Sequence, residues 1–98
     1  MPEQLQIPPN VTSDANATEL IRAWASRGGL VCSLNPGAWP QDQGPVAWGI
    51  LLSDVARHVA DALQQSYGLD KTAVLARMRS VFDAELDRPT AATEGKFV

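Results

Sequence analysis

The chain has one cysteine, one histidine and no long hydrophobic run, and each shortage excludes a class of protein. A single cysteine, Cys32, cannot form an internal disulfide, which agrees with a reducing compartment. The apolar runs are far shorter than the ~20 residues of a membrane-spanning helix. Residues 1–10 have neither the basic start nor the apolar centre of a signal peptide. We therefore expect a cytoplasmic protein that does not associate with membranes.

Positive charge is also scarce. The chain has 8 Lys and Arg against 11 Asp and Glu, so its net charge is −3 and its pI is near 4.9. Because Lys and Arg contacts to phosphates supply most non-specific affinity for nucleic acid, we expect no nucleic-acid partner. The 98 residues, of which 45% are hydrophobic, suffice for one core. We predict a single domain over residues 1–88 and a flexible tail over residues 89–98, which hold small polar residues, a proline and a glycine.

Short periodic segments in the first third of the chain predict two strands with a helix between them. Glu3–Ile7 alternates polar and apolar residues and stops at a proline pair, which is typical of a short strand. Residues 17–27 follow Asp14 and Asn16, either of which can cap a helix. They carry apolar side chains at spacings of three and four and end at Arg27 before two glycines. This pattern predicts a helix. Leu30–Leu34, bounded by glycines and an Asn-Pro-Gly turn, predicts the second strand, with Cys32 pointing into the core.

Two amphipathic helices are predicted in the second half. The first begins at Pro45, which suits a first helical turn, and ends near Gly68, a glycine that can cap it. Asp70 can cap the second helix, whose apolar residues repeat on one face as far as Leu86. Because the loop between them is short, we expect an antiparallel helical hairpin.

These elements predict an α+β fold with the order β-α-β-α-α, in which the helical hairpin packs on a two-stranded sheet. A sheet of two strands is only marginally stable in water. The free edge of Leu30–Leu34 can pair antiparallel with the same strand of a second copy, giving four strands around a two-fold axis. We therefore expect a homodimer that forms through this strand.

Catalytic groups are few. Asp54 precedes His58 by one helical turn, a spacing at which a carboxylate can orient an imidazole as a general base. The pattern favours a histidine at the surface margin, because no serine nucleophile or metal-ligand pair stands at a recognisable spacing. A cysteine and a histidine can serve as a thiol nucleophile and its general base, and Cys32 and His58 are residues of these types. The predicted inward position of Cys32 nevertheless favours an inert core thiol. We predict no catalytic residue, metal or cofactor.

Two of the three tryptophans lie in the stretch NPGAWPQDQGPVAWG, over residues 35–49. Trp48 falls on the apolar stripe of the helix that begins at Pro45, so we assign it to the core. Trp39 lies among prolines and glycines, in a loop that loses little conformational entropy on ordering and can hold a large ring. The ring either closes the end of the core or forms a wall of an apolar pocket, with Trp48 and His58 near the mouth.

Three blocks of the sequence carry a resemblance: PPNVTSD, PGAW and AWGILLSDVARHVA. In content and order they resemble a family of short alphaproteobacterial proteins of unknown function. The resemblance covers most of the chain up to the last helix. It implies a stand-alone bacterial domain of about this size, and it brings no activity and no catalytic residue.

The function that we expect is a non-enzymatic, homodimeric module that binds another protein. The alternative is a small-molecule-binding protein with a pocket between the Trp39 loop and the following helix, lined by Trp39, Trp48, Asp54 and His58. An enzyme is the third interpretation. A filled contact beside Trp39 would favour the first of these, and an open pocket there would favour the second.

Overall fold

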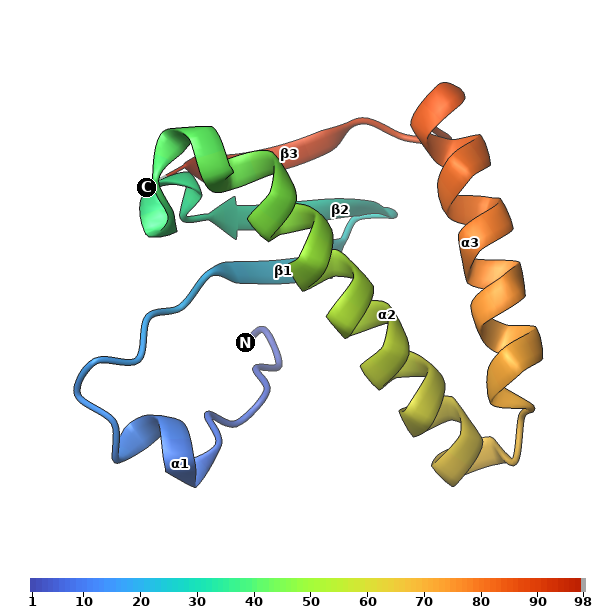
Figure 1. The fold of residues 1–98 in the computed structure, drawn as a ribbon, viewed down its shortest axis with the longest axis horizontal. Helices are drawn as coiled ribbons and strands as arrows, with labels where there is room; N and C mark the ends of the chain where they lie inside the picture. Colours follow the sequence, from blue (N-terminus) through green and yellow to red (C-terminus); the bar gives the residue numbers. More distant parts are fainter. Residues whose placement is uncertain (98) are drawn as a thin grey trace.

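A computed structural model describes residues 1–97, in which three strands form one mixed sheet (Figure 1). β1 (Ile21–Ser26) and β2 (Gly29–Leu34) pair antiparallel, and β3 (Thr93–Phe97) pairs parallel to β2 on its other side. Between β2 and β3 the chain forms two long helices, α2 (Gly44–Tyr67) and α3 (Lys71–Asp87). The predicted α+β fold with a helical hairpin is therefore confirmed.

A tight turn, not a helix end, follows the segment that we predicted to be helical over residues 17–27. Arg27 and Gly28 both have positive φ angles, 52° and 79°, as the two-residue turn of a β-hairpin requires. The turn places Trp24 opposite Val31 and Ala25 opposite Leu30. The helix prediction is wrong because antiparallel pairing of Ile21–Ser26 with β2 overrides the helical spacing of the apolar residues in this segment.

The N-terminal segment also differs from the prediction. Glu3–Ile7 belongs to no strand, and a short helix, α1 (Pro9–Thr12), follows it. Leu5 and Ile7 remain 97% and 56% exposed. Alternation of polar and apolar residues makes a segment suitable for a sheet but supplies no partner strand, and β1 pairs with β2 instead.

The central place of β2 contradicts the expected dimer contact. β2 is hydrogen-bonded to β1 along one edge and to β3 along the other. No free row of backbone groups remains on Leu30–Leu34, so a second copy cannot add to this strand. The sheet has three strands where we predicted two, and within the described residues its outer strands are β1 and β3.

The third strand lies in the segment that we predicted to be a flexible tail. Glu85 holds the chain as it leaves α3, because its carboxylate accepts hydrogen bonds from the amide and the hydroxyl of Thr90. Gly95 then lies against the backbone of Cys32 with a φ of 147°. Any side chain at Gly95 would collide with the carbonyl of Cys32. The assignment of residues 1–88 to a single domain stays a prediction.

The ends of the two long helices follow the local signals of the sequence. Pro45 lies in the first turn of α2, and Gly68 ends that helix with a φ of 71° and an amide that donates to the carbonyl of Gln64. The carboxylate of Asp70 caps α3 by accepting a hydrogen bond of 2.9 Å from the amide of Ala73. Of the described helices, none is sufficiently long and apolar to cross a membrane.

The two helices cover the sheet only in part. α2 crosses in front of the sheet, whereas α3 stands beside it, and the helices meet near Gly68 and diverge toward their other ends (Figure 1). Among the described residues only Cys32 and Ala60 are buried apolar side chains. The accessible surface is 8554 Å², whereas a compact monomer of this mass exposes about 5,400 Å². The protomer therefore leaves much apolar surface without cover.

Candidate functional site

The four residues that the sequence singles out lie in two separate places. Trp39 follows a short 3-10 helix (Pro36–Ala38) and meets Trp48 on the first turns of α2. Asp54 and His58 lie farther along α2 and line a pocket of about 380 Å³. The structure thus pairs Trp39 with Trp48 and Asp54 with His58.

The two tryptophan rings pack edge to face. Their centroids are 5.5 Å apart and their planes meet at 86°. Both rings are half-buried, so the contact fills space between the loop and α2. Aromatic pairs in this arrangement contribute about 0.5–1.5 kcal/mol beyond the burial of their area. Trp39 is therefore held by a packing contact with α2.

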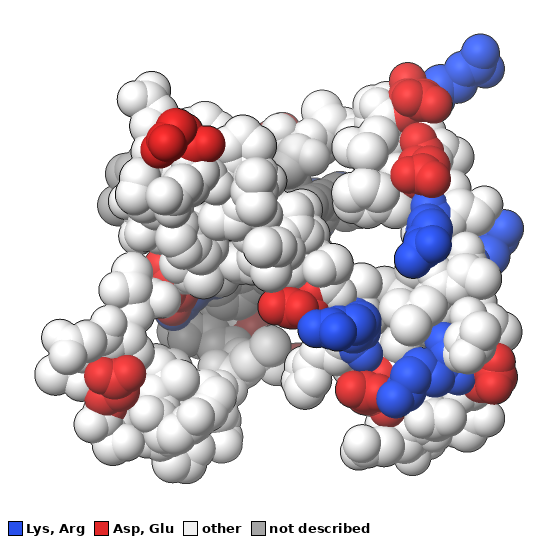
Figure 2. All heavy atoms as spheres, viewed as in Figure 1, with Lys and Arg blue, Asp and Glu red and all other residues white. Residues whose placement is uncertain are grey.

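The pocket beside His58, called here the His58 pocket, is rich in charge of both signs. Its lining residues are Asp54, Arg57, His58, Asp61, Lys71 and Leu75. Arg57 donates from Nη2 to Oδ1 of Asp54 at 2.6 Å, and Nζ of Lys71 is 2.5 Å from Oδ1 of Asp61. Because Lys71 belongs to α3 and Asp61 to α2, the second ion pair joins the two helices near their loop. Figure 2 shows acidic and basic side chains side by side in this part of the molecule.

The pKa of Asp61 is lowered by its surroundings. The largest cause is the hydrogen bond from Lys71, and the positive charges of Lys71, His58 and Arg57 act in the same direction. Asp61 and Lys71 are 44% and 46% exposed, so water and salt screen their interaction. The pair helps to set the position of α3 on α2, and its energetic contribution is small.

Replacing Asp61 with asparagine should make the protein less sensitive to acid. A carboxylate whose pKa is lowered in the folded state stabilises that state above its ordinary pKa of 3.8, and the stabilisation is lost as pH falls through the lower folded value. Wild-type protein should therefore have the higher Tm near pH 6, and the difference from Asp61→Asn should shrink as the pH falls below 3.8. Thermal unfolding followed by circular dichroism near pH 6 and below pH 3.8 measures this difference.

The matched control is Asp83→Asn, because Asp83 lies on α3 and forms no ion pair within residues 1–97. This control should follow the wild-type pH dependence. An equal Tm difference between wild type and Asp61→Asn at both pH values would contradict the assigned role of Lys71.

Cys32 is not part of the His58 pocket. It lies in the central strand β2 with 9% of its surface exposed, and no residue of β2 lines the pocket. The Cys32 and His58 pair considered from the sequence is therefore not assembled there. No group of three His, Cys, Asp or Glu side chains within residues 1–97 is arranged to hold a metal ion.

Sequence reasoning found half of this pocket and missed the rest. Asp54 and His58 are one helical turn apart, and the same spacing places Arg57 and Asp61 beside them. Lys71 and Leu75 could be found only from the way in which α3 packs on α2. A second pocket, of about 580 Å³, lies between the N-terminal segment and β1, where Ile7, Val11 and Trp24 are among its lining residues.

Comparisons with known proteins agree with the resemblance seen in the sequence. A solved structure described as "a putative pyruvate dehydrogenase from the photosynthetic bacterium Rhodopseudomonas palustrus CGA009" is 35% identical, with a TM-score of 0.70, over 94% of this chain and 91% of that chain. No curated protein matches this chain. The family model described as "Domain of unknown function (DUF5076)" matches residues 4–90. Since this match spans most of the chain, the protein belongs to the DUF5076 family of domains of unknown function.

Proposed function

We propose that the protein is a non-enzymatic, homodimeric module that binds another protein. The observation that carries the proposal is the uncovered surface of the protomer. Its surface exceeds that of a compact monomer of the same mass by about 3,100 Å², and its radius of gyration of 15.3 Å exceeds the expected value of about 12.6 Å. Large exposed apolar surfaces in soluble proteins mark sites of protein contact.

The arrangement of the polar groups supports binding over catalysis. In the His58 pocket each carboxylate is already paired with a cation, and no serine, cysteine or threonine lines the pocket to act as a nucleophile. The pocket has no deeply buried group whose environment would prepare it for acid–base chemistry. The description of the similar structure as a dehydrogenase applies to that protein. A single, buried cysteine supports our proposal of a cytoplasmic location.

The mass of the protein in solution tests the homodimer. Light scattering coupled to size exclusion, at loading concentrations from about 1 to 200 µM, should give twice the 10.5 kDa of one chain, because obligate homodimers bury several thousand Å². A mass of one chain across the whole range would overturn the proposal. Retention of the dimer in 1 M salt is also expected, since the uncovered side chains are apolar.

A second candidate function is small-molecule binding, favoured by the grouping of Asp54 and His58 in one pocket with two cations. The ligand that suits this lining is a small molecule with charges of both signs. The filled contact between Trp39 and Trp48 speaks against the pocket that we expected beside Trp39. Calorimetric titration with a free amino acid, which carries both charges, tests this alternative, and inorganic phosphate tests the two cations alone. Heat that is lost in His58→Gln would support it, and no heat with either probe would exclude these ligand classes.

A further inference from the structure

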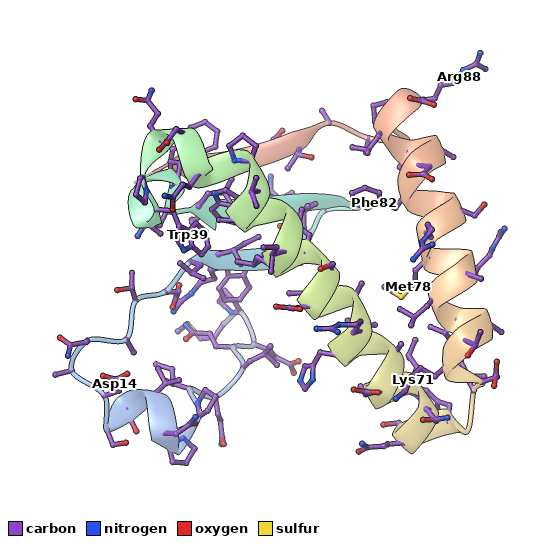
Figure 3. The ribbon with its side chains drawn as sticks, viewed as in Figure 1. Asp14, Trp39, Lys71, Met78, Phe82 and Arg88 are labelled. Carbon is purple, nitrogen blue, oxygen red and sulfur yellow. The ribbon has the colours of Figure 1, made fainter. Side chains whose placement is uncertain are left out.

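The apolar face of α3 is covered along only half of its length. Val74, Leu75 and Met78, near the start of the helix, are half-buried beside α2. Farther along the same face the exposed fractions rise to 43% for Val81, 51% for Phe82 and 69% for Leu86. The cause is the divergence of α2 and α3 away from their loop (Figure 1). Figure 3 shows that Met78 and Phe82 both point from α3 toward the space between the two helices.

α2 also has an uncovered apolar stripe. Leu52, Val55 and Val59 are separated by three and four residues, so they share one side of the helix. Their exposed fractions are 45%, 49% and 38%. We group them with the exposed half of α3 as the open hairpin surface, defined by Leu52, Val55, Val59, Val81, Phe82 and Leu86, which are all at least 38% exposed.

The regular spacing of this surface indicates what covers it. Single exposed apolar residues are common, but two helical stripes left open on neighbouring helices are the pattern of an incomplete bundle. A second helical hairpin with the same two stripes would supply the missing helices of a four-helix arrangement. Every copy of this chain carries such a hairpin. In a two-fold symmetric pair the same patch serves on both protomers, so both open surfaces close in one contact.

The amount of uncovered surface on the protomer agrees with a second copy of the chain as the partner. An interface of ordinary size covers about 800 Å² on each partner, whereas obligate homodimers bury about 2,000–5,000 Å² in total. The whole protomer, its exposed N-terminal segment included, has about 3,100 Å² more surface than a compact monomer. An obligate homodimer covers about 1,000–2,500 Å² on each partner, so the open hairpin surface needs to supply only a part of this excess. The sheet cannot provide this contact through β2, because both edges of that strand are already paired.

We propose that a second copy of this chain covers the open hairpin surface, with α3 of each protomer lying against α2 and α3 of the other. This inference rests on the homodimer proposed above and names its contact. Phe82 and Leu86 then become buried anchors, and the ion pair between Lys71 and Asp61 remains outside the contact as a support of the hairpin. Apolar anchors of this kind carry most of the affinity of an interface.

The test measures the dimer dissociation constant of Phe82→Ala and Leu86→Ala by sedimentation velocity over a dilution series. Each substitution should weaken the dimer by about 30-fold or more, the effect of removing a central anchor. The matched control is Val46→Ala. Val46 is 66% exposed on α2 but lies nine residues before Val55, on the opposite side of the helix. The dimer dissociation constant of Val46→Ala should differ from that of wild type by less than about threefold, as for residues outside the centre of an interface.

The outcomes separate this inference from the proposal on which it rests. A monomeric wild-type protein would overturn both. A dimeric wild type whose affinity is unchanged in Phe82→Ala and Leu86→Ala would overturn only the open hairpin surface. If Leu5→Ala weakened the dimer and Phe82→Ala and Leu86→Ala did not, the contact would lie at the N-terminal segment, and the open hairpin surface would again be overturned. If alanine at Phe82 reduces the helical circular dichroism signal, Phe82→Leu, which keeps an apolar side chain, should restore both the signal and the dimer.

Discussion

Replacing Gly95 with alanine should release β3 from the sheet. The φ of 147° at Gly95 is one that residues with a side chain rarely adopt, and a Cβ there would collide with the backbone of Cys32 in the central strand. Because backbone atoms of a paired strand cannot move aside as a flexible side chain can, the clash separates β3 from β2. Strain and overpacking of this kind cost about 2–4 kcal/mol. Loss of β3 would also expose the edge of β2.

Hydrogen exchange of the backbone amides measures this effect. In Gly95→Ala the amides of β3 and of the facing edge of β2 should lose protection, while those of α2 keep theirs. The control is Gly49→Ala in α2, where an added Cβ meets no atom within 4 Å. Alanine in a helix interior is favoured over glycine by about 0.5–1 kcal/mol, so the control should be more stable than wild type. If the amides of β3 were as protected in Gly95→Ala as in the wild type, the close approach of Gly95 to the backbone of Cys32 would be refuted.

Elements whose ends carry local signals were predicted well. α2 and α3 begin and end near a proline, a glycine and a capping aspartate, and each of these residues acts through neighbours within four positions. Such signals are complete in the sequence, since the groups that satisfy a helix end lie in the same segment. The helical hairpin follows from the same information, because the loop between the helices is short.

The strands were predicted poorly, and the reason is that a strand is defined by a partner elsewhere in the chain. Ile21–Ser26 has a pattern that fits either a helix or a strand, and pairing with β2 decides between them. β3 pairs with residues about sixty positions earlier, and Glu3–Ile7 alternates without gaining any partner. Only at Gly95 is there a local indication, because a glycine in a strand often marks a close approach of another backbone.

The candidate site shows the same division. Asp54 and His58 could be grouped from the sequence because one helical turn separates them. Trp39 and His58 were expected at one pocket, but the turns of α2 between Trp48 and His58 keep them apart. Lys71 enters the His58 pocket from α3, a position that depends on how the two helices pack. Long-range packing therefore limits the prediction of the site as it does that of the sheet.

Trp39→Ala should destabilise the protein by about 2 kcal/mol, which is less than the ~3–5 kcal/mol lost when a fully buried tryptophan is truncated. Trp39 is half-buried, and its main aromatic partner is Trp48, against which it packs edge to face. Alanine removes both the buried area and the aromatic contact. Urea unfolding at one fixed protein concentration measures the loss, since stability and association are linked in a dimer.

The control Trp39→Phe keeps an aromatic ring against Trp48 and should retain most of the stability. The comparison also tests whether the Trp39 ring packs as part of the domain or guards a pocket of its own, as the sequence left open. If the ring packs as part of the domain, the free energy of unfolding should fall slightly in Trp39→Phe and further in Trp39→Ala, and ligand affinity should not change. A ring that guards a ligand would leave the free energy of unfolding within about 0.5 kcal/mol in both variants, as surface substitutions do, and would change ligand affinity instead. The edge-to-face contact favours the first result, because a lid that must open to admit a ligand would have to break that contact first.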